Sequence, residues 1–108
     1  MTAPQPAVRR GELWLVRLDK VRPAVVLSRD PLGALLKTVI VAPVTSRVRG
    51  LSTEVPITAH DGAQPPSVAN LDDLQRIERS RFLRRVGKCH GNTMSAICAA
   101  IRTATGCD

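Results

Sequence analysis

Short apolar runs rich in Val, Ile and Leu recur along most of this 108-residue chain, with turn residues between them. Each run has the length of a β-strand and is too short for a typical helix. The separating segments contain Gly, Pro, Asp and Ser, which tight turns and loops favour. This spacing predicts a mainly β fold, and a chain of this length has room for one domain with one core.

Five to seven short, mostly antiparallel strands are expected. The expected strands and extended segments span residues 12–18, 23–27, 38–44, 53–57, 67–71, 74–78 and 82–88. In the first of them Trp14, Val16 and Leu18 share one face. Segments 28–36 and 60–66 contain Gly and Pro and are expected to be turns or loops. Because Pro43 has no N–H to donate, the third strand is expected at an edge of the sheet or with a bulge near its end.

A helical pattern follows Gly91. Met94, Ile97, Cys98 and Ile101 have the spacing of one helix face, with Asn92 as the expected N-cap and Gly106 as the end. Strands and helix together predict a small SH3-like barrel of short antiparallel strands with the C-terminal helix against it. Residues 1–9 are expected to be a disordered N-terminal lead, and residues 10–108 the single domain.

The charge of the chain indicates a polyanionic partner. Its formal net charge is +7 and its isoelectric point about 10.7, and nucleic acid is the first candidate. No apolar run approaches the length of a membrane span, so no membrane partner is expected. No apolar stretch follows the first charges, so no secretory signal is expected and the cytoplasm is the predicted location.

The common enzyme signatures are absent from the sequence. It contains no glycine-rich phosphate loop, no Cys/His set with metal-ligand spacing, and no Ser/His/Asp order with elbow glycines. The cysteines Cys89, Cys98 and Cys107 are interpreted as thiols. Neither a metal nor another cofactor is therefore expected.

A basic rim is predicted where the second strand begins and the third ends. Antiparallel pairing of these strands would place Arg22 opposite Thr45. Arg offers a planar fork for phosphate, and hydroxyl groups can donate to the remaining oxygens. Further candidate RNA-binding residues at this rim are Arg17, Lys20, Ser46, Arg47 and Arg49. The alternative is a solvated basic rim without a ligand.

A second basic set follows residue 74. It consists of Arg76, Arg79, Arg81, Arg84, Arg85 and Lys88. The set is compatible with an RNA track and equally with the charged outer face of an edge strand. Trp14 and Phe82 are predicted in the core rather than as platforms for bases.

The order of motifs resembles the MazF/PemK family of toxin endoribonucleases. The resemblance is carried by Arg10-Gly11-Glu12-Leu13-Trp14, then by Arg22-Pro23-Ala24-Val25-Val26-Leu27-Ser28, and then by Val41-Ala42-Pro43-Val44-Thr45-Ser46. Glu54-Val55, Ser67-Val68 and the C-terminal helix follow in the expected order. The match covers nearly the whole chain from residue 9.

The resemblance implies a homodimeric barrel of the CcdB/PemK type that cleaves single-stranded RNA at a short sequence without a metal. It also implies inhibition by a cognate, MazE-like antitoxin. The family's catalytic arginine before proline corresponds to Arg22, and its threonine after the third strand corresponds to Thr45.

The sequence departs from the family pattern at two places. The loop between the first two strands is reduced to Asp19-Lys20-Val21, so no general base can be assigned, and the titratable candidates are Asp19, His60 and Asp61. The family's Gln, apolar, basic motif is Asp73-Leu74-Gln75 here. Asp73 and Gln75 are therefore candidates for contacts that set RNA specificity.

Two alternatives of other classes remain. One is a non-catalytic poison of DNA gyrase with the same fold, as in CcdB, and the other is a plain RNA-binding barrel. Arg22 and Thr45 favour cleavage. A homodimer is also expected from an exposed apolar strand at 38–44 and an apolar helix face. An acidic, partly disordered antitoxin segment is expected to cover the basic rim.

Overall fold

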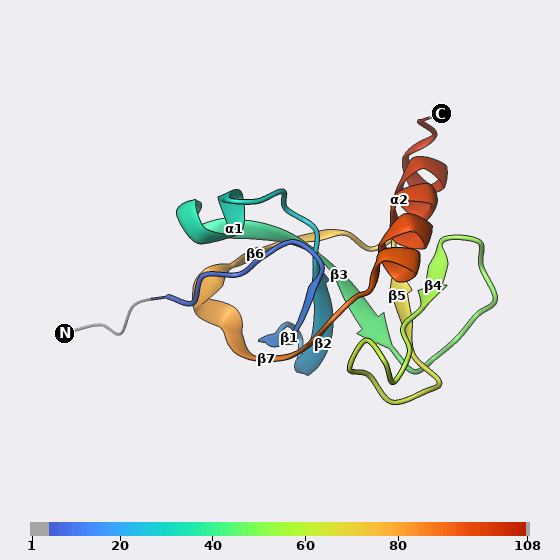
Figure 1. Ribbon diagram of the computed structural model, residues 1–108, viewed down its shortest axis with the longest axis horizontal. Coiled ribbons are helices and arrows are strands. Elements are labelled where there is room, and N and C mark those ends of the chain that lie inside the picture. The colour runs from blue at the N-terminus through green and yellow to red at the C-terminus, as the bar shows by residue number, and fades with distance from the viewer. Residues whose placement is uncertain (1–4, 108) are drawn as a thin grey trace.

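The computed structural model describes residues 5–107 (Figure 1). Its strands are β1 (Glu12–Arg17), β2 (Val21–Val26), β3 (Thr38–Thr45), β4 (Glu54–Pro56), β5 (Val68–Asn70), β6 (Gln75–Glu78) and β7 (Phe82–Lys88). Its helices are α1 (Leu32–Leu35), the 3-10 turn η1 (Arg79–Arg81) and α2 (Gly91–Thr105). Among these residues no helix is long and apolar enough to cross a membrane.

The strands form one antiparallel sheet in the order β4-β5-β3-β2-β1-β7, and β6 pairs with β3. The expected mainly β antiparallel fold with a C-terminal helix is confirmed. Within residues 5–107 no ladder joins β7 to β6 or β4, so the pairing leaves the sheet open, and the expected SH3-like barrel stays a prediction. The sheet is open because η1 carries the chain from β6, beside β3, to the outer edge of β1.

The edge position expected for the strand that contains Pro43 is wrong. β3 lies in the middle of the sheet, with β2 along one edge and β6 and β5 along the other. On that second edge β6 pairs as far as Val41 and β5 begins at Val44. Pro43 thus stands in the gap between two ladders, where its missing N–H breaks no pairing.

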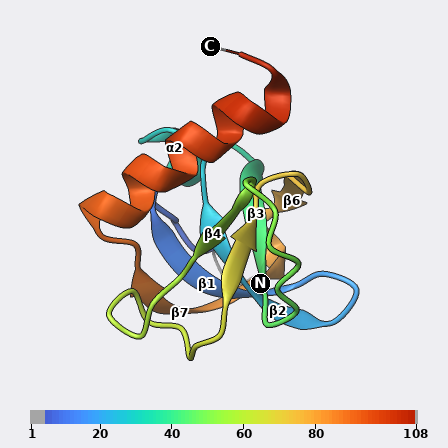
Figure 2. The ribbon, with the colours of Figure 1, turned by 90° about the vertical axis from the view of Figure 1, so that its right-hand side faces the viewer.

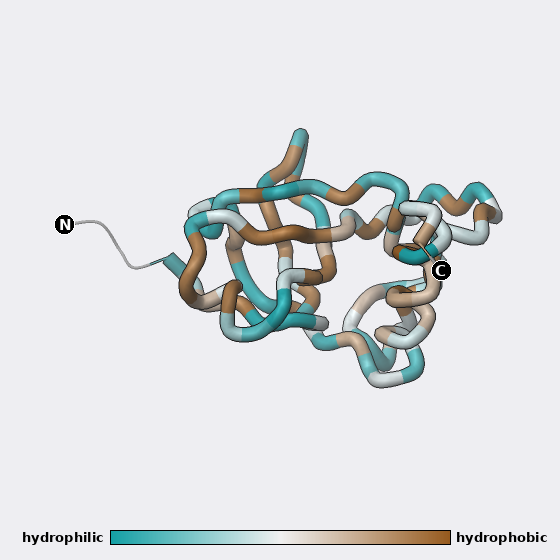
Figure 3. The backbone as a smooth tube through the Cα atoms, turned by 90° about the horizontal axis from the view of Figure 1, so that it is seen from above, coloured by the Kyte–Doolittle hydropathy of each residue, from teal (hydrophilic) through white to brown (hydrophobic). Residues whose placement is uncertain are grey.

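Both faces of the sheet are covered. Along β2, Val25 belongs to the core beneath α2, whereas Ala24 and Val26 belong to a second core on the other face. Trp14 and Phe82 meet edge to face in the second core, with ring centroids 5.9 Å apart, as the core prediction for them requires. α2 lies across β4 and β5 (Figure 2), and the apolar segments run through the interior of the fold (Figure 3).

Part of the expected N-terminal lead packs into the second core. Val8 is buried, and its N–H donates to the carbonyl of Gly33 at 3.2 Å. A Cβ at Gly33 would lie 2.2 Å from the Val8 carbonyl oxygen, so only glycine allows this approach. The segment expected as a turn at 28–36 also contains the short helix α1. Residues 1–4, the rest of the expected lead, lie outside the described residues.

The expected N-cap at Asn92 is wrong, because α2 begins at Gly91 with His90 as its N-cap residue. The cap comes from a distant loop. Asp61 accepts hydrogen bonds from the His90 N–H at 2.8 Å and from the Thr93 hydroxyl at 3.0 Å. A carboxylate outside the helix thus satisfies the first turn and complements the helix dipole. The expected end at Gly106 is confirmed by its left-handed conformation, with φ 72°.

The buried side chain of Asp61 connects its own loop to the first turn of α2. Its carboxylate also accepts from the N–H and the hydroxyl of Thr58, both at 3.0 Å. Burial raises the pKa of Asp61, but the hydrogen bonds from Thr58, His90 and Thr93 outweigh it and lower the pKa below 3.8. The charged carboxylate therefore stabilises the folded chain.

We predict that Asp61→Asn lowers the free energy of unfolding by about 2 kcal/mol, because it leaves buried donors facing an amide. The contribution of the Asp61 charge is complete above pH 3.8 and is lost as the pH falls through the lower pKa of the folded state. The variant should thus lose less stability on acidification than the wild type. Urea unfolding as a function of pH measures both effects. Glu78→Gln, at an exposed site, is the control, and equal midpoints for Asp61→Asn and wild type would contradict the prediction.

Candidate functional site

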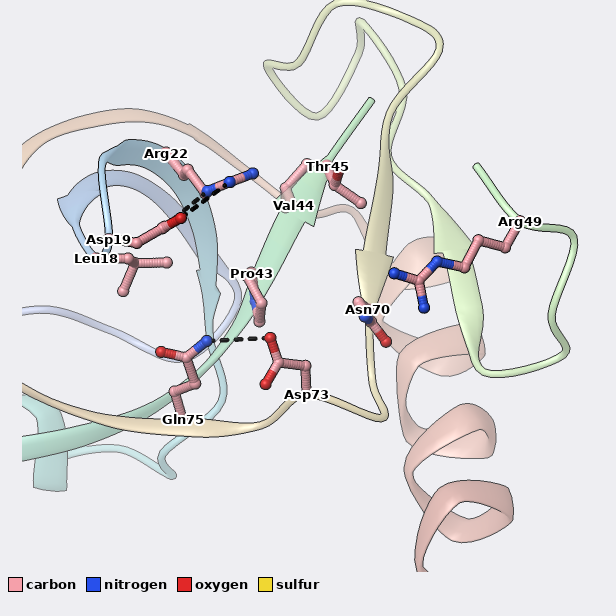
Figure 4. Close-up of a pocket in the computed structure, with 10 residues that line it drawn as sticks. All are labelled: Leu18, Asp19, Arg22, Pro43, Val44, Thr45, Arg49, Asn70, Asp73 and Gln75. Atoms are coloured by element: carbon pink, nitrogen blue, oxygen red, sulfur yellow. Dashed lines mark hydrogen bonds and ion pairs between the residues drawn. The ribbon is translucent and has the colours of Figure 1, made fainter. Parts of the chain in front are cut away.

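A pocket of about 300 Å³ opens where β2 begins and β3 ends (Figure 4). Strands from distant parts of the sequence and the loops after them contribute its walls. The lining residues are Leu18, Asp19, Arg22, Pro43, Val44, Thr45, Arg49, Asn70, Asp73 and Gln75. Charged and amide side chains dominate this set, so the pocket suits a polar ligand.

The pairing of β2 with β3 brings Arg22 and Thr45 to the same pocket. Ala24 pairs with Pro43, and the same register, continued two residues further, sets Arg22 opposite Thr45. The ladder itself ends at Ala24 and Pro43, so Arg22 and Thr45 stand beyond the last pair with their side chains available to a ligand. The predicted juxtaposition of these two residues is confirmed.

The short loop before β2 holds the guanidinium of Arg22. Arg22 Nε donates to Asp19 Oδ1 at 3.1 Å and Arg22 Nη2 donates to Asp19 Oδ2 at 3.2 Å. This contact lowers the pKa of Asp19 and raises the pKa of Arg22. Asp19 is thereby a weaker base than an ordinary aspartate and orients the arginine instead. Arg22 Nη1 makes no hydrogen bond within residues 5–107 and remains available to an anion.

Thr45 has its hydroxyl at the mouth of the same pocket. Its Oγ1 accepts the N–H of Arg47 at 3.1 Å, which fixes the oxygen and leaves the hydroxyl proton free to donate. The side chain is half-buried. Arg22 and Thr45 together offer hydrogen-bond donors from two sides, an arrangement suited to phosphate oxygens.

A carboxylate on β4 shapes the loop that follows β3. Glu54 Oε1 accepts from the N–H groups of Arg49 at 3.0 Å, Gly50 at 2.8 Å and Leu51 at 3.1 Å. Gly50 has φ 80°, a conformation that favours glycine. These contacts hold the loop so that Arg49 lines the pocket. Sequence reasoning missed this role of Glu54, although a carboxylate four residues after Gly50 was the available signal.

Polar side chains form the wall opposite Arg22. Gln75 Nε2 donates to Asp73 Oδ2 at 3.1 Å, and the N–H of Asp72 donates to Asn70 Oδ1 at 3.1 Å. Asp73 and Gln75 thus both line the pocket, and their role in specificity stays a prediction. Asn70 was not predicted, because only the pairing of β5 with β3 and β4 brings it here.

A second hollow of about 450 Å³ shares Arg22, Val44 and Thr45 with the first. Lys20 and Ser46, both predicted RNA-binding residues, line it together with Gln64, Ser67 and Arg84. The structure places neither Arg17 nor Arg47 in either hollow. Both are exposed, Arg17 at the end of β1 and Arg47 in the loop after β3.

Most of the second basic set serves the fold. Arg76 donates to the Thr38 hydroxyl at 3.3 Å, Arg79 to the carbonyl oxygens of Leu36 at 2.6 Å and Pro6 at 3.2 Å, and Arg85 pairs with Glu12 at 3.4 Å. Arg84 is the member of the set that reaches the second hollow. The pattern is that of a charged outer face with one residue at the site.

The remaining candidates for a general base lie away from the pocket. Asp61 is buried in the cap of α2, and His60 stacks on His90 with ring centroids 3.8 Å apart. Burial and then the charge of Asp61 raise the pKa of Cys89 to about 12, so this thiol is inert. Within residues 5–107 no group of three or more His, Cys, Asp or Glu side chains could hold a metal ion.

Comparison with known proteins gives the family of the chain. Residues 9–105 match the family described as "PemK-like, MazF-like toxin of type II toxin-antitoxin system". Endoribonuclease MazF3 of Mycobacterium tuberculosis is 38% identical over 96 residues, which cover 89% of this chain and 93% of that protein. Probable endoribonuclease MazF2 of the same species is 34% identical over 102 residues, covering 93% of this chain and 100% of that protein.

Solved structures agree with the sequence matches. The Mycobacterium tuberculosis toxin MazF-mt6 superposes with a TM-score of 0.86 at 37% identity, covering 90% of this chain and 98% of that one. A MazE-MazF crystal structure from Deinococcus radiodurans gives a TM-score of 0.79 at 26% identity, covering 95% of this chain and 100% of that one. The chain therefore belongs to the PemK-like, MazF-like toxin family of type II toxin-antitoxin systems.

Proposed function

We propose that this chain is a toxin endoribonuclease that cleaves single-stranded RNA at a short sequence in the cytoplasm, without a metal ion. The observation that carries the proposal is the joint placement of Arg22 and Thr45 in one pocket. The relatives named endoribonucleases support cleavage over the gyrase poison and over plain RNA binding.

The reaction proposed is attack of a ribose 2′-hydroxyl on the adjacent phosphorus. The 2′-oxygen loses its proton and forms a bond to phosphorus, the bond to the 5′-oxygen breaks and that oxygen takes up a proton, and the products carry a 2′,3′-cyclic phosphate and a 5′-hydroxyl. The phosphorane transition state has more negative charge than the ground state, and Arg22 and Thr45 stabilise that extra charge. Because the pKa of arginine lies far above neutral pH, the role of Arg22 is electrostatic rather than that of a proton donor.

Asp19 acts in this scheme as a positioning residue. Its two hydrogen bonds to Arg22 fix the plane of the guanidinium and leave Nη1 for the phosphate. Such preorganisation removes the cost of ordering the arginine during the reaction. The general base stays unassigned, because the lowered pKa of Asp19 makes it weak and the other candidates lie elsewhere.

The basic residues around the pocket hold the RNA backbone. Lys20, Ser46 and Arg49 line the two hollows, and the exposed Arg17 and Arg47 extend the cationic surface beyond them. Phosphate contacts of this kind position the RNA and make binding weaker as salt increases.

Arg22→Ala should lower the cleavage rate at least about a hundredfold, because a preorganised charge-stabilising donor is lost. Arg22→Lys should restore little, since a point charge cannot replace the fork. Thr45→Ala should cost less than Arg22→Ala. Single-turnover cleavage of a long unstructured RNA measures the rates, and Arg29→Ala, at an exposed arginine outside both hollows, is the matched control. Near-normal cleavage by Arg22→Ala, with RNA binding retained, would refute the proposed mechanism.

We also propose a cognate, MazE-like antitoxin with an acidic, partly disordered segment that covers the basic rim. The MazE-MazF complex of Deinococcus radiodurans supports such a partner. In a purified complex Arg22 and Arg47 should be protected from phenylglyoxal, whereas both should react in the free chain. Equal modification of both arginines in the inhibited complex would exclude this mode of inhibition.

We keep the homodimer as a proposal, although the exposed apolar strand at 38–44, one of the two reasons for expecting it, is not present. β3 is a central strand, and its side chains from Val41 to Val44 are buried within one subunit. The exposed apolar side chains available to an interface are Val21, Leu35, Leu36, Val48, Leu51, Leu74 and Leu83. Light scattering at micromolar concentration should give twice the mass of one chain. A monomer under these conditions would contradict the proposal.

A further inference from the structure

The wall opposite Arg22 in the first pocket carries the opposite charge. Asp73 lies there with the amides of Asn70 and Gln75 (Figure 4). The ion pairs within residues 5–107 join Arg22 to Asp19 and Arg85 to Glu12, so no arginine is paired with Asp73. A carboxylate repels phosphate, and this wall is thus unsuited to the RNA backbone. It suits the hydrogen-bonding edge of a base.

The hydrogen bonds that Asn70, Asp73 and Gln75 make within the chain determine which of their atoms stay free to bind a base. Asn70 Oδ1 accepts the N–H of Asp72, so the NH2 of the Asn70 amide is the group left as a donor. Gln75 Nε2 donates one of its two N–H groups to Asp73 Oδ2, so Gln75 Oε1 and Asp73 Oδ1 are left as acceptors and one N–H of Gln75 stays free. No hydrogen bond within the described part of the chain uses these free groups. The wall therefore presents amide donors on Asn70 and Gln75 and two acceptors, of which Asp73 is the charged one.

Guanine has the edge that matches this set. Its O6 accepts, and its N1–H and N2 amine both donate. Adenine and cytosine offer one amine beside a ring nitrogen that accepts, so each gives the two acceptors of the wall a single donor group where guanine gives two. Uracil offers one N–H between two carbonyl oxygens, and one of these would face the carboxylate. An acceptor that the bound base shields from water and leaves unpaired costs binding free energy, which makes the match selective.

We propose that Asn70, Asp73 and Gln75 form a guanine-selecting subsite beside the phosphate held by Arg22. Its position next to the cut bond rests on the proposed function, whereas its base preference depends on the pocket alone. Arg49, which lines the same pocket, can stack its planar guanidinium on the base. Gln75 stands where the family motif commonly has a basic residue, so at this position no cation neutralises Asp73.

The test uses short oligonucleotides with 2′-fluoro ribose, which lack the attacking hydroxyl and cannot be cut. Each is a uridine oligomer with one central guanosine, inosine, adenosine or cytidine, and fluorescence anisotropy gives its affinity. Guanosine should bind at least about tenfold more tightly than adenosine or cytidine. Inosine lacks the N2 amine and should bind several-fold more weakly than guanosine.

Asp73→Asn should abolish the difference between guanosine and inosine, because the single amide oxygen accepts from Gln75 and the NH2 group, which cannot accept, then faces the N2 amine. Asp72→Asn is the matched control, since Asp72 lies outside the pocket and accepts from the Thr53 hydroxyl. This control should keep the wild-type preference. Equal affinity for all the oligonucleotides, or a guanosine preference that survives Asp73→Asn, would overturn the subsite.

A mapping of the fragments cut from a long RNA separates the two proposals. A chain that prefers guanosine in the binding test but cuts no RNA overturns the proposed function and leaves the subsite standing. A chain that cuts RNA at sites without guanosine at a fixed position overturns the subsite and leaves the function standing. Cleavage with guanosine at a fixed position supports both.

Discussion

The antiparallel pairing of β2 with β3 is the constraint on which the site depends. Val25 lies opposite Ala42 in the core beneath α2, while Ala24 and Val26 belong to the core on the other face. A slip of one residue would put Val25 into the space filled by Ala24 or Val26 and leave both cores mispacked, so core packing specifies the register. The same register sets Arg22 opposite Thr45. The geometry of the proposed site is therefore a consequence of core packing.

Carboxylates then fix the loops around this framework. Asp19 holds the guanidinium of Arg22, Glu54 gathers the N–H groups of the loop that carries Arg49, and Asp61 ties a distant loop to the start of α2. Each of these acids accepts hydrogen bonds as an anion, the strong form of the interaction. The negative charge of these acids is therefore taken up by hydrogen bonds inside the chain. Lys20, Arg47 and Arg49 make no ion pair among the described residues. The exposed surface near the pocket stays basic.

The sequence predicts what local patterns determine. Strand spacing and turn residues predict the strands, and antiparallel pairing of the second strand with the third predicts the meeting of Arg22 with Thr45. Features that depend on contacts between distant segments were not predictable. Asp61 as the cap of α2, Val8 beside Gly33, and Asn70 in the pocket wall each require the folded chain. The edge position predicted for Pro43 was wrong for the same reason. The gap between the β6 and β5 ladders, where Pro43 lies, cannot be recognised from the sequence.

The most direct measurement is the mass of the fragments that the wild-type chain releases from an unstructured RNA in excess chelator. Attack by the 2′-hydroxyl, stabilised by Arg22 and Thr45, predicts discrete fragments with 2′,3′-cyclic phosphate and 5′-hydroxyl ends, and no cleavage of the corresponding DNA. Intact RNA, or fragments with 3′-hydroxyl ends, would contradict it.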